Sequence, residues 1–339
     1  MRLSIAILFL GLSSCADTVD RPKPKVVTGL AEGAAPARCE AVAPAFEIPA
    51  SLDQMAASPD SVLALLYADA GVIQIADHAL RPVRSYSLAE TGPEAVANPR
   101  DVTFGAGGRL AVLDGALHRL VHLTGNGDIA DYTTLQFVPD RFARAANGYY
   151  IFPVKPPTHT TGLAYFLADS LDDPVRLPLE AADVPNPQIY SLANLMVPLV
   201  RGRELLAAHQ FVVPIMHVVR MTVAGARVRR VDIPIAAELA DRAWWTPEPP
   251  FEETELQDML VPVVDMVAGR AGEPVLLVRT GRRRDGHYEK GLMRLTDTLE
   301  FRDAFLLEGD PAYIAYLAAK DVYVAASTEG EFWRCTLPS

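Results

Sequence analysis

The sequence predicts an all-β protein, a six-bladed β-propeller of four-stranded blades that is closed by an N-terminal strand joining the last blade. Three observations predict it. From residue 51 onward the apolar residues come in runs of five to eight, separated by Gly, Pro, Asp and Asn, and almost no stretch has a helical period. A glycine-containing or polar turn followed by a short β-rich strand recurs six times. Two cysteines lie near opposite ends of the part expected to fold.

The composition bounds the class of protein. With 339 residues, 50% hydrophobic and 22% charged, the chain is neither fully disordered, collagen-like nor a multi-span membrane protein. It has 31 Lys and Arg against 42 Asp and Glu, a net charge of −11 that becomes −12 if a signal peptide carrying Arg2 is removed. A surface this acidic repels phosphate backbones, so no nucleic-acid partner is expected.

The N-terminus predicts export. Met1-Arg2 is a short positive start, and the apolar run Leu3–Leu12 spans only about 15 Å as a helix, half of a bilayer core, which indicates a signal peptide. The next residues, Leu12-Ser13-Ser14-Cys15, resemble the lipobox of bacterial lipoproteins. The resemblance implies cleavage before Cys15 and lipidation of this residue, and Ala16 after it favours the outer membrane. A plain secretory signal with an incidental cysteine is the alternative.

The domain organisation follows from these features. Residues 16–37 are rich in Ala, Pro, Gly and charge and predict a flexible tether with a reach of about 25–30 Å. We expect a signal peptide at 1–14, a lipid-anchored tether at 15–37 and a propeller at 38–339, with an insertion at 236–258 between blades four and five. The expected location is the cell envelope, as an outer-membrane lipoprotein facing the periplasm or the surface, with the membrane contacted through the lipid alone.

The repeat sets the number of blades. The first strand residue of each repeat is Val62, Leu110, Tyr149, Leu205, Val275 or Val322. The spacings are 48, 39, 56, 70 and 47 residues, which bracket the roughly 40–50 residues of a propeller blade. Six repeats therefore predict six blades.

The clearest repeat, at 98–135, divides into strands at about 100–105, 109–113, 117–123 and 128–135, with a hairpin turn at 125–128. Its Pro99, Asp114 and Arg119 resemble the pattern of NHL repeats. The resemblance is partial in 51–88 and weak elsewhere. It implies a fold like those of exported NHL-like and TolB-like propellers.

The two ends of the propeller are expected to meet. The last repeat offers strands at about 312–317, 321–326 and 330–336 and lacks a fourth, whereas Arg38–Pro49 has no blade of its own. We expect this segment to be the outer strand of blade six, which closes the ring. An exported chain meets an oxidising compartment, so a disulfide between Cys39 and Cys335 is predicted. Two unrelated free thiols are the alternative.

Propeller topology places most of the unusual sequence on one face. Loops that join second to third strands, and those that join blades, emerge together; they include 155–161, 209–214, 281–287 and the insertion 236–258. The tryptophan pair of the insertion is either a partner-contact patch or packing, and the arginine run faces either the acidic run 252–258 or solvent. The candidate binding residues are His159, His209, Trp244, Trp245, Arg282, Arg283, Arg284 and His287.

Candidate chemistry is sparse. His159, His209 and His287 lie in equivalent loops and could converge on a metal or catalytic site, but no local ligand motif supports one, and His118, His122 and His217 are expected within strands. Carboxylates near the inner-strand starts could ring the channel mouth, namely Asp101, Asp140, Asp258 and Asp265. The chain has no GxSxG, HExxH, Walker, GxGxxG–helix or EF-hand motif, so no catalytic residue is assigned and no metal site is predicted.

Two hypotheses of function follow. The leading one is a lipid-anchored, non-catalytic binding scaffold for a protein partner or an envelope glycan, without a cofactor. The alternative is a propeller hydrolase or lyase, similar to lactonases, with its site in the central channel and Ca²⁺ or Zn²⁺ as a metal. Metal-dependent propeller lactonases use a ring of carboxylates in the channel, but their Glu/Asn/Asp pattern is not recognisable here.

Overall fold

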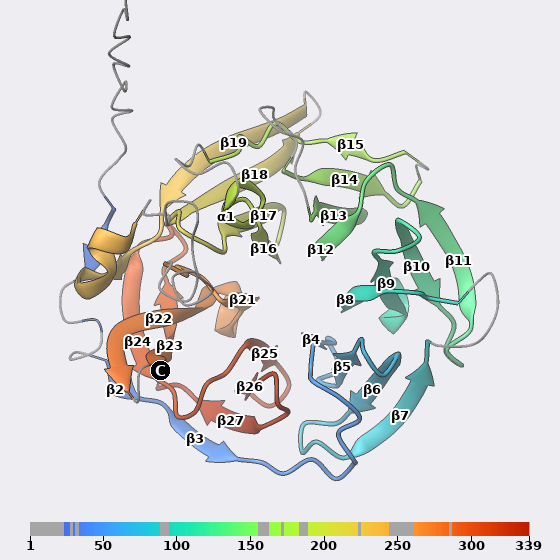
Figure 1. The fold of residues 1–339 in the computed structure, drawn as a ribbon, viewed down its shortest axis with the longest axis horizontal. Coiled ribbons are helices and arrows are strands. Elements are labelled where there is room, and N and C mark those ends of the chain that lie inside the picture. The colour runs from blue at the N-terminus through green and yellow to red at the C-terminus, as the bar shows by residue number, and fades with distance from the viewer. Residues whose placement is uncertain are drawn as a thin grey trace, which may run out of the picture.

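Six sheets surround a central axis in the computed structural model (Figure 1). The structure describes residues 24–27, 30, 34–88, 95–154, 163–170, 173–182, 189–222, 225–243, 260–284 and 287–338. The chain is a six-bladed β-propeller of four-stranded antiparallel blades, which confirms the predicted fold class. No helix within the described residues is both long and apolar enough to cross a membrane.

The first three blades run in chain order from the centre outward. Blade one consists of β4 (Gln54–Ala57), β5 (Leu63–Tyr67), β6 (Val72–Ala76) and β7 (Pro82–Ser87). Blade two consists of β8 (Pro99–Phe104), β9 (Leu110–Asp114), β10 (Arg119–Leu123) and β11 (Ile129–Thr134). Blade three consists of β12 (Pro139–Ala145), β13 (Gly148–Pro153), β14 (Tyr165–Ala168) and β15 (Val175–Arg176).

The last three blades include the two chain ends. Blade four consists of β16 (Met196–Arg201), β17 (Glu204–His209), β18 (Ile215–Thr222) and β19 (Gly225–Asp232). Blade five contains β21 (Asp265–Ala268), β22 (Pro274–Arg284), β23 (His287–Leu295) and β24 (Phe301–Leu306). Blade six consists of β25 (Tyr313–Leu317), β26 (Val322–Ala326), β27 (Phe332–Thr336) and β3 (Arg38–Ala41). The short helices are η1 (Ala106–Gly108), α1 (Tyr190–Ala193), η3 (Ala237–Arg242) and η4 (Arg270–Gly272).

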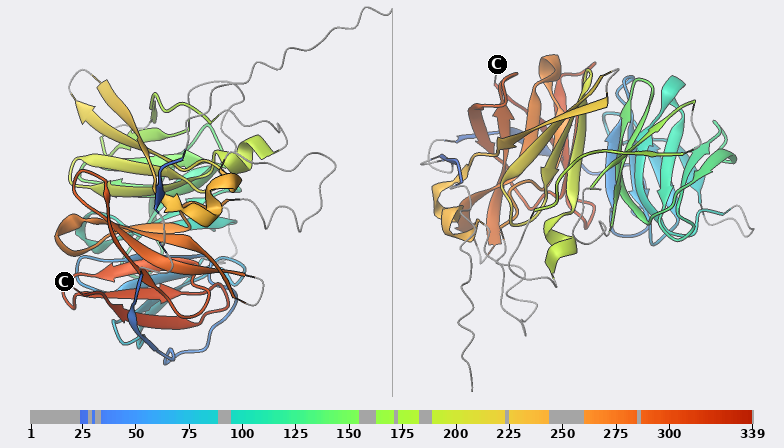
Figure 2. Two further views of the ribbon diagram at one scale, coloured as in Figure 1. Left: turned by 90° about the vertical axis from the view of Figure 1, so that its left-hand side faces the viewer. Right: turned by 90° about the horizontal axis from the view of Figure 1, so that it is seen from above.

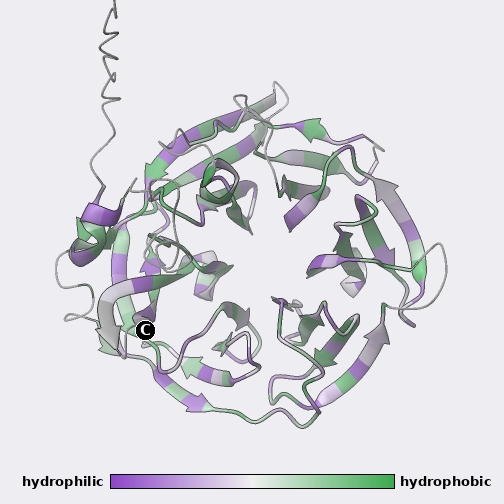
Figure 3. Cartoon of the chain, viewed as in Figure 1, coloured by the Kyte–Doolittle hydropathy of each residue, from purple (hydrophilic) through white to green (hydrophobic). Residues whose placement is uncertain are grey.

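The hydrophobic core lies between neighbouring blades. Second strands such as β5, β9 and β13 are buried along their whole length, since another blade covers each of their faces. One cluster, for example, joins β5 and β6 of blade one to β8 and β9 of blade two. Outer strands such as β7 and β11 are mostly exposed, and hydrophilic bands recur along the rim (Figure 3). This explains the continuous apolar runs that the sequence shows for second strands.

The ring closes between the two ends of the chain. β3 pairs antiparallel with β27, and Cys39 lies directly opposite Cys335 in the register. A disulfide joins the two cysteines across 296 residues of sequence. The predicted disulfide is therefore present, and the described strands agree with the expected position of residues 38–41 at the outer edge of blade six.

The segment before the ring differs from the expected tether. β1 (Val26–Val27) pairs in parallel with β20 (Ile235–Ala236), and β2 (Ala35–Pro36) pairs in parallel with β24. Leu30 between them is only 3% exposed and packs in a cluster with Ile235, Leu239 and neighbouring apolar residues. The described parts of 24–37 thus form an N-terminal strap on the outside of blade five. The apolar residues of this segment show no periodic pattern in the sequence. They pack nevertheless, because the propeller supplies strand edges for pairing and an apolar surface for Leu30.

Candidate functional site

A cavity of about 550 Å³ occupies the central channel and is lined by the innermost strand of every blade. Its polar layer consists of residues at the start of the inner strands, namely Gln54, Asp101, Arg141 and Asp265. Two of these positions are equivalent by sequence and register, because Pro99-Arg100-Asp101 and Pro139-Asp140-Arg141 both place a bulge after the proline. The fold therefore brings Arg141 to the level at which blade two carries an aspartate.

The two aspartates of this layer hold adjacent blades together. Asp101 accepts the N–H of Val102 at 2.8 Å and the N–H of Phe142, in blade three, at 2.9 Å. In the same way Asp265 accepts an N–H of its own strand and that of Ile314, in blade six, each at 2.8 Å. Burial raises the pKa of Asp101 to about 7 and that of Asp265 to about 6, against the lowering effect of Arg141 and of the backbone donors.

The guanidinium of Arg141 is the unusual group in the channel. It forms no hydrogen bond, and no ion pair within 4 Å, to any described residue, although it lies within electrostatic reach of Asp101, Asp140 and Asp265. Burial lowers the pKa of Arg141, but these carboxylates outweigh it and the net shift is upward. Asp140, beside it in sequence, has its pKa raised by burial. A charged side chain with five donors is thus presented to the cavity.

The polar layer does not fit a divalent cation. Within the described residues no group of three or more His, Cys, Asp or Glu side chains is arranged to hold a metal ion. The guanidinium of Arg141 already lies among the channel carboxylates. In addition, both carboxylate oxygens of Asp101 and both of Asp265 accept backbone N–H groups. The donor set therefore suits a ligand that accepts hydrogen bonds from arginine rather than a Ca²⁺ or Zn²⁺ ion.

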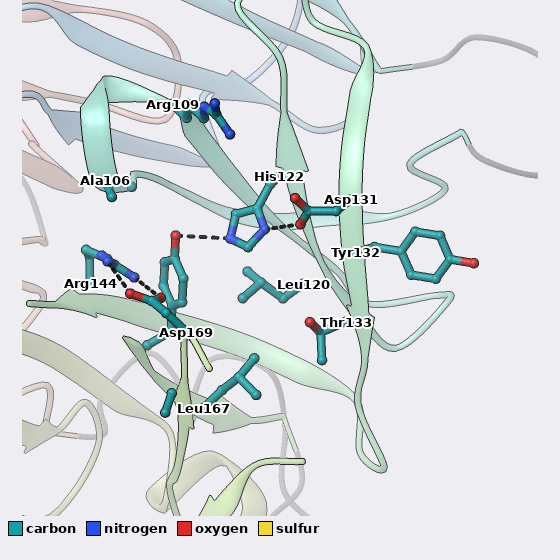
Figure 4. A pocket seen from close by; sticks show the side chains of 13 residues that line it. Ala106, Arg109, Leu120, His122, Asp131, Tyr132, Thr133, Arg144, Leu167 and Asp169 are labelled. Carbon is teal, nitrogen blue, oxygen red and sulfur yellow. Dashed lines mark hydrogen bonds and ion pairs between the residues drawn. The ribbon is translucent and has the colours of Figure 1, made fainter. Parts of the chain in front are cut away.

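A second pocket, of about 430 Å³, lies between blades two and three (Figure 4). His122 on β10 contacts Asp131 through Nδ1 at 2.5 Å and the hydroxyl of Tyr149 through Nε2 at 3.1 Å. Arg144 donates two hydrogen bonds to Asp169, at 2.5 and 2.8 Å. These side chains link the outer strand of blade two to the second strand of blade three.

The contact between His122 and Asp131 has a counterpart in blade five. By strand register Arg294 on β23 occupies the position of His122 on β10, and Asp303 occupies that of Asp131. Arg294 Nε donates to Asp303 at 2.6 Å. A basic and an acidic residue thus face each other between third and fourth strands in both blades. We therefore assign this pocket to the architecture of the ring and place the candidate site in the channel.

His209, predicted on the binding face, is 1% exposed at the end of β17. Its Nδ1 lies 3.0 Å from the carbonyl oxygen of Ala193, so this nitrogen carries the hydrogen, and its Nε2 accepts from Nε2 of His217 at 3.1 Å. Burial lowers the pKa of His209 to about 4 and that of His217 to about 3. Both rings are neutral and buried between strands. His118, expected within a strand, instead lies in the turn before β10, with φ of 49°.

The structure does not describe the side chains of the other predicted residues of the binding face. Cys15, His159, Trp244, Trp245 and Asp258 lie outside the described residues, as do most of the insertion and the loop 155–161. Arg282, Arg283 and Arg284 end β22, and His287 begins β23, but only their backbone is described. Their hairpin extends blade five beyond the usual strand length. The proposed convergence of His159, His209 and His287 is therefore tested at one residue alone, and His209 is buried.

The sequence identified the carboxylates of the channel layer but not Arg141, around which they lie. The carboxylates Asp101, Asp140 and Asp265 were expected near the channel mouth, and all three act electrostatically on Arg141. Arg141 itself was not singled out. The signal that could have found it is the repeated Pro-x-(Asp/Arg) pattern at 99–101 and 139–141, read as two equivalent channel positions.

Comparisons with known proteins show the fold and no family. No protein-family model matches the chain, and no curated protein matches it. A gluconolactonase from Xanthomonas campestris is similar in structure, with a TM-score of 0.57 and 12% identity over 94% of this chain and 96% of that one. A streptogramin B lyase has a TM-score of 0.53 and 13% identity over 89% and 98%. A luciferin-regenerating enzyme has a TM-score of 0.57 and 9% identity over 89% and 95%. Identities this low establish the propeller fold alone.

Proposed function

We propose that this chain is a lipid-anchored envelope propeller whose central channel binds a hydroxylated carboxylic acid or its lactone and opens the lactone by hydrolysis. The observation that carries the proposal is Arg141, a cation in the channel that makes no hydrogen bond to a described residue and has carboxylates around it. Propellers similar in structure include a gluconolactonase and a streptogramin B lyase, which supports an enzymatic activity of this class on the fold.

The residues divide the work of lactone opening. Arg141 would donate N–H groups to the carbonyl oxygen and stabilise the negative charge that develops on it. Asp140, which precedes Arg141 in the chain and lies within its electrostatic reach, would accept a proton from the attacking water as the new C–O bond forms. The ring C–O bond then breaks, the leaving alkoxide takes up that proton, and the product is the open hydroxy acid. The neighbouring Asp101 and Asp265 keep the blades in register, so that Arg141 is held at the channel.

The test is turnover and binding by the full chain. Hydrolysis of δ-gluconolactone, followed by pH-stat, is expected to fall at least about 100-fold in Arg141→Gln and in Asp140→Asn, by the usual size of such effects. Arg109→Gln, an exposed arginine of the turn after η1, serves as the matched control and should keep wild-type turnover. Gluconate binding by calorimetry separates the outcomes. Binding without turnover that is lost in Arg141→Gln would make the channel a binding site, and neither binding nor turnover would refute the proposal.

A binding scaffold is the second candidate, because the structure gathers irregular segments on one face. α1 and η3 project from the same side of the ring (Figure 2), and both lie in connections between blades. A protein partner or an envelope glycan is the proposed occupant. Replacing residues 244–256 by a Gly-Ser linker leaves Leu239 of η3 in place, so folding should persist while partner capture from a native envelope is lost. A collapse of thermal stability instead would make the insertion a structural plug.

A further inference from the structure

Blade four carries a positive charge in an acidic protein. Between residues 189 and 236 there are six arginines and two carboxylates, a local charge of +4 in a chain whose net charge is −11. Both histidines of this blade are neutral, because burial lowers the pKa of each below 5. The arginines are Arg201, Arg203, Arg220, Arg227, Arg229 and Arg230.

Three of these arginines line a groove of about 350 Å³ at the rim of the blade. Arg220 on β18 and Arg227 and Arg229 on β19 surround it, with Val218 and Val228 as its apolar lining. Glu204 also lines it and forms ion pairs with Arg220 at 3.0 Å and with Arg201 at 2.9 Å. Arg227 and Arg229 are exposed and form no ion pair within 4 Å to any described residue. We name this feature the arginine groove.

The register makes the arrangement costly for the fold. Arg220 lies directly opposite Arg227 in the β18–β19 ladder. Like charges at directly opposed positions destabilise a sheet. Charged residues often protect an edge strand from pairing with other chains, but mixed signs would serve that purpose as well. Among the described outer strands, β24 and β3 each carry one arginine and one carboxylate, whereas β19 carries three arginines against one carboxylate, Asp232.

The groove faces away from the N-terminal strap. Arg227 and Arg229 lie toward the Gly225 end of β19, whereas β1 docks on β20, beyond the Asp232 end. A chain anchored through its N-terminus would therefore direct this end of blade four away from the anchoring membrane. An anionic lipid surface is thus less well placed to reach the groove than a polymer of the envelope.

We propose that the arginine groove binds a carboxylated polysaccharide, with Arg227 and Arg229 donating hydrogen bonds to its carboxylates. Arginine side chains give bidentate recognition of carboxylates. Arg227 and Arg229 are two residues apart on β19 and therefore lie on the same face of the sheet. The proposal rests on the proposed location in the envelope, and it does not depend on the proposed activity of the channel.

The test uses the full chain with polygalacturonate as the probe and neutral dextran as the control polymer. Affinity electrophoresis should show retardation by polygalacturonate only, weakening as NaCl rises because salt screens exposed charges. Arg227→Glu/Arg229→Glu should weaken binding at least about tenfold, and Arg227→Lys/Arg229→Lys should weaken it less, since charge is kept but the bidentate geometry is lost. The single variants Arg227→Glu and Arg229→Glu are matched by Arg109→Glu, a charge reversal of the same size on another blade, which should bind as wild type.

Three outcomes would overturn the proposal. They are no retardation of the wild type, equal retardation of the Arg227→Glu/Arg229→Glu variant, or equal loss in Arg109→Glu, which would indicate net charge alone. Sedimentation with phosphatidylglycerol vesicles tests the membrane directly. Vesicle binding that requires Arg227 and Arg229, without polygalacturonate binding, would replace the glycan by a lipid surface. Circular dichroism of each variant, with δ-gluconolactone turnover as a separate readout, distinguishes this result from unfolding and from failure of the channel proposal.

Discussion

The carboxylate of Asp101 in blade two accepts the backbone N–H of Phe142 in blade three at 2.9 Å. The same bond recurs on the opposite side of the ring, where Asp265 accepts the N–H of Ile314 at 2.8 Å. Each aspartate also accepts the N–H of the residue that follows it. A side chain of the inner strand thus satisfies buried backbone donors at the point where two blades meet, without a ladder of hydrogen bonds between them.

Removing this carboxylate should loosen the ring. Asp101→Ala leaves two backbone N–H groups without their acceptor, and each buried unsatisfied donor costs about 1–3 kcal/mol. Urea denaturation should therefore give a free energy of unfolding lower by at least about 1 kcal/mol. Asp128→Ala, in the exposed turn between β10 and β11, is the control and should change it little. Equal stability of the two variants would contradict the role assigned to Asp101.

The channel carboxylates should make stability fall as pH rises. The pKa values of Asp101 and Asp265 are about 7 and about 6 in the folded chain, above their ordinary value of 3.8. The folded state therefore binds more protons than the unfolded state between about pH 4 and pH 7, so this contribution is complete below pH 4 and is lost toward pH 7–8. Denaturation at several pH values should show a smaller alkaline loss in Asp265→Asn than in wild type. An identical dependence of the free energy of unfolding on pH in the variant and the wild type would contradict this prediction.

The buried pair His209 and His217 should make stability fall as the pH decreases. The pKa values of His209 and His217 are lowered to about 4 and about 3 from an ordinary 6.5, and Nδ1 of His217 is buried with no hydrogen-bond partner. The unfolded state thus binds more protons below pH 6.5, and stability is lost as pH falls through this range. His217→Gln should reduce the acid loss. His78→Gln, outside the pair, should retain the wild-type acid limb.

Loss of the disulfide should destabilise the closed ring. A disulfide between residues 296 apart in sequence gives a chain-entropy stabilisation of about 5.7 kcal/mol, although measured values for engineered disulfides are often smaller. Cys39→Ala/Cys335→Ala should therefore unfold at lower urea concentration than oxidised wild type, and dithiothreitol should have no further effect on the variant. Non-reducing peptide mapping should recover the linked peptides. Two free thiols in protein exported to the periplasm would contradict the disulfide between Cys39 and Cys335.

The lipid anchor remains to be tested at Cys15. Cys15→Ser should appear in the soluble fraction with its signal uncleaved or cut elsewhere, because the thiol that accepts the lipid is absent. Fractionation with and without detergent, with the mass of the N-terminal peptide, provides the measurement. A variant that stays membrane-bound and matures normally would show that Leu12–Cys15 is not a lipobox.

Periodicity and turn residues were enough to indicate the propeller. Apolar second strands recurring about every 40–50 residues need two covering faces each, and a ring of blades supplies them. A missing fourth strand at one end and an unassigned segment at the other indicated closure, and the two cysteines agreed with it. The strap was missed because Val26, Val27 and Leu30 have no period of their own. Their burial depends on edges that exist only in the assembled ring.

By itself, the sequence determined the local part: which runs are strands, where turns fall, how many repeats exist and which residues carry charge. The tertiary structure alone decided which of those charges meet. Arg141 lies 40 residues from Asp101 and 124 from Asp265, yet one channel layer gathers all three. Periodicity is set by each residue's neighbours along the chain, whereas electrostatic fields depend on distance through space, which only closure of the ring establishes.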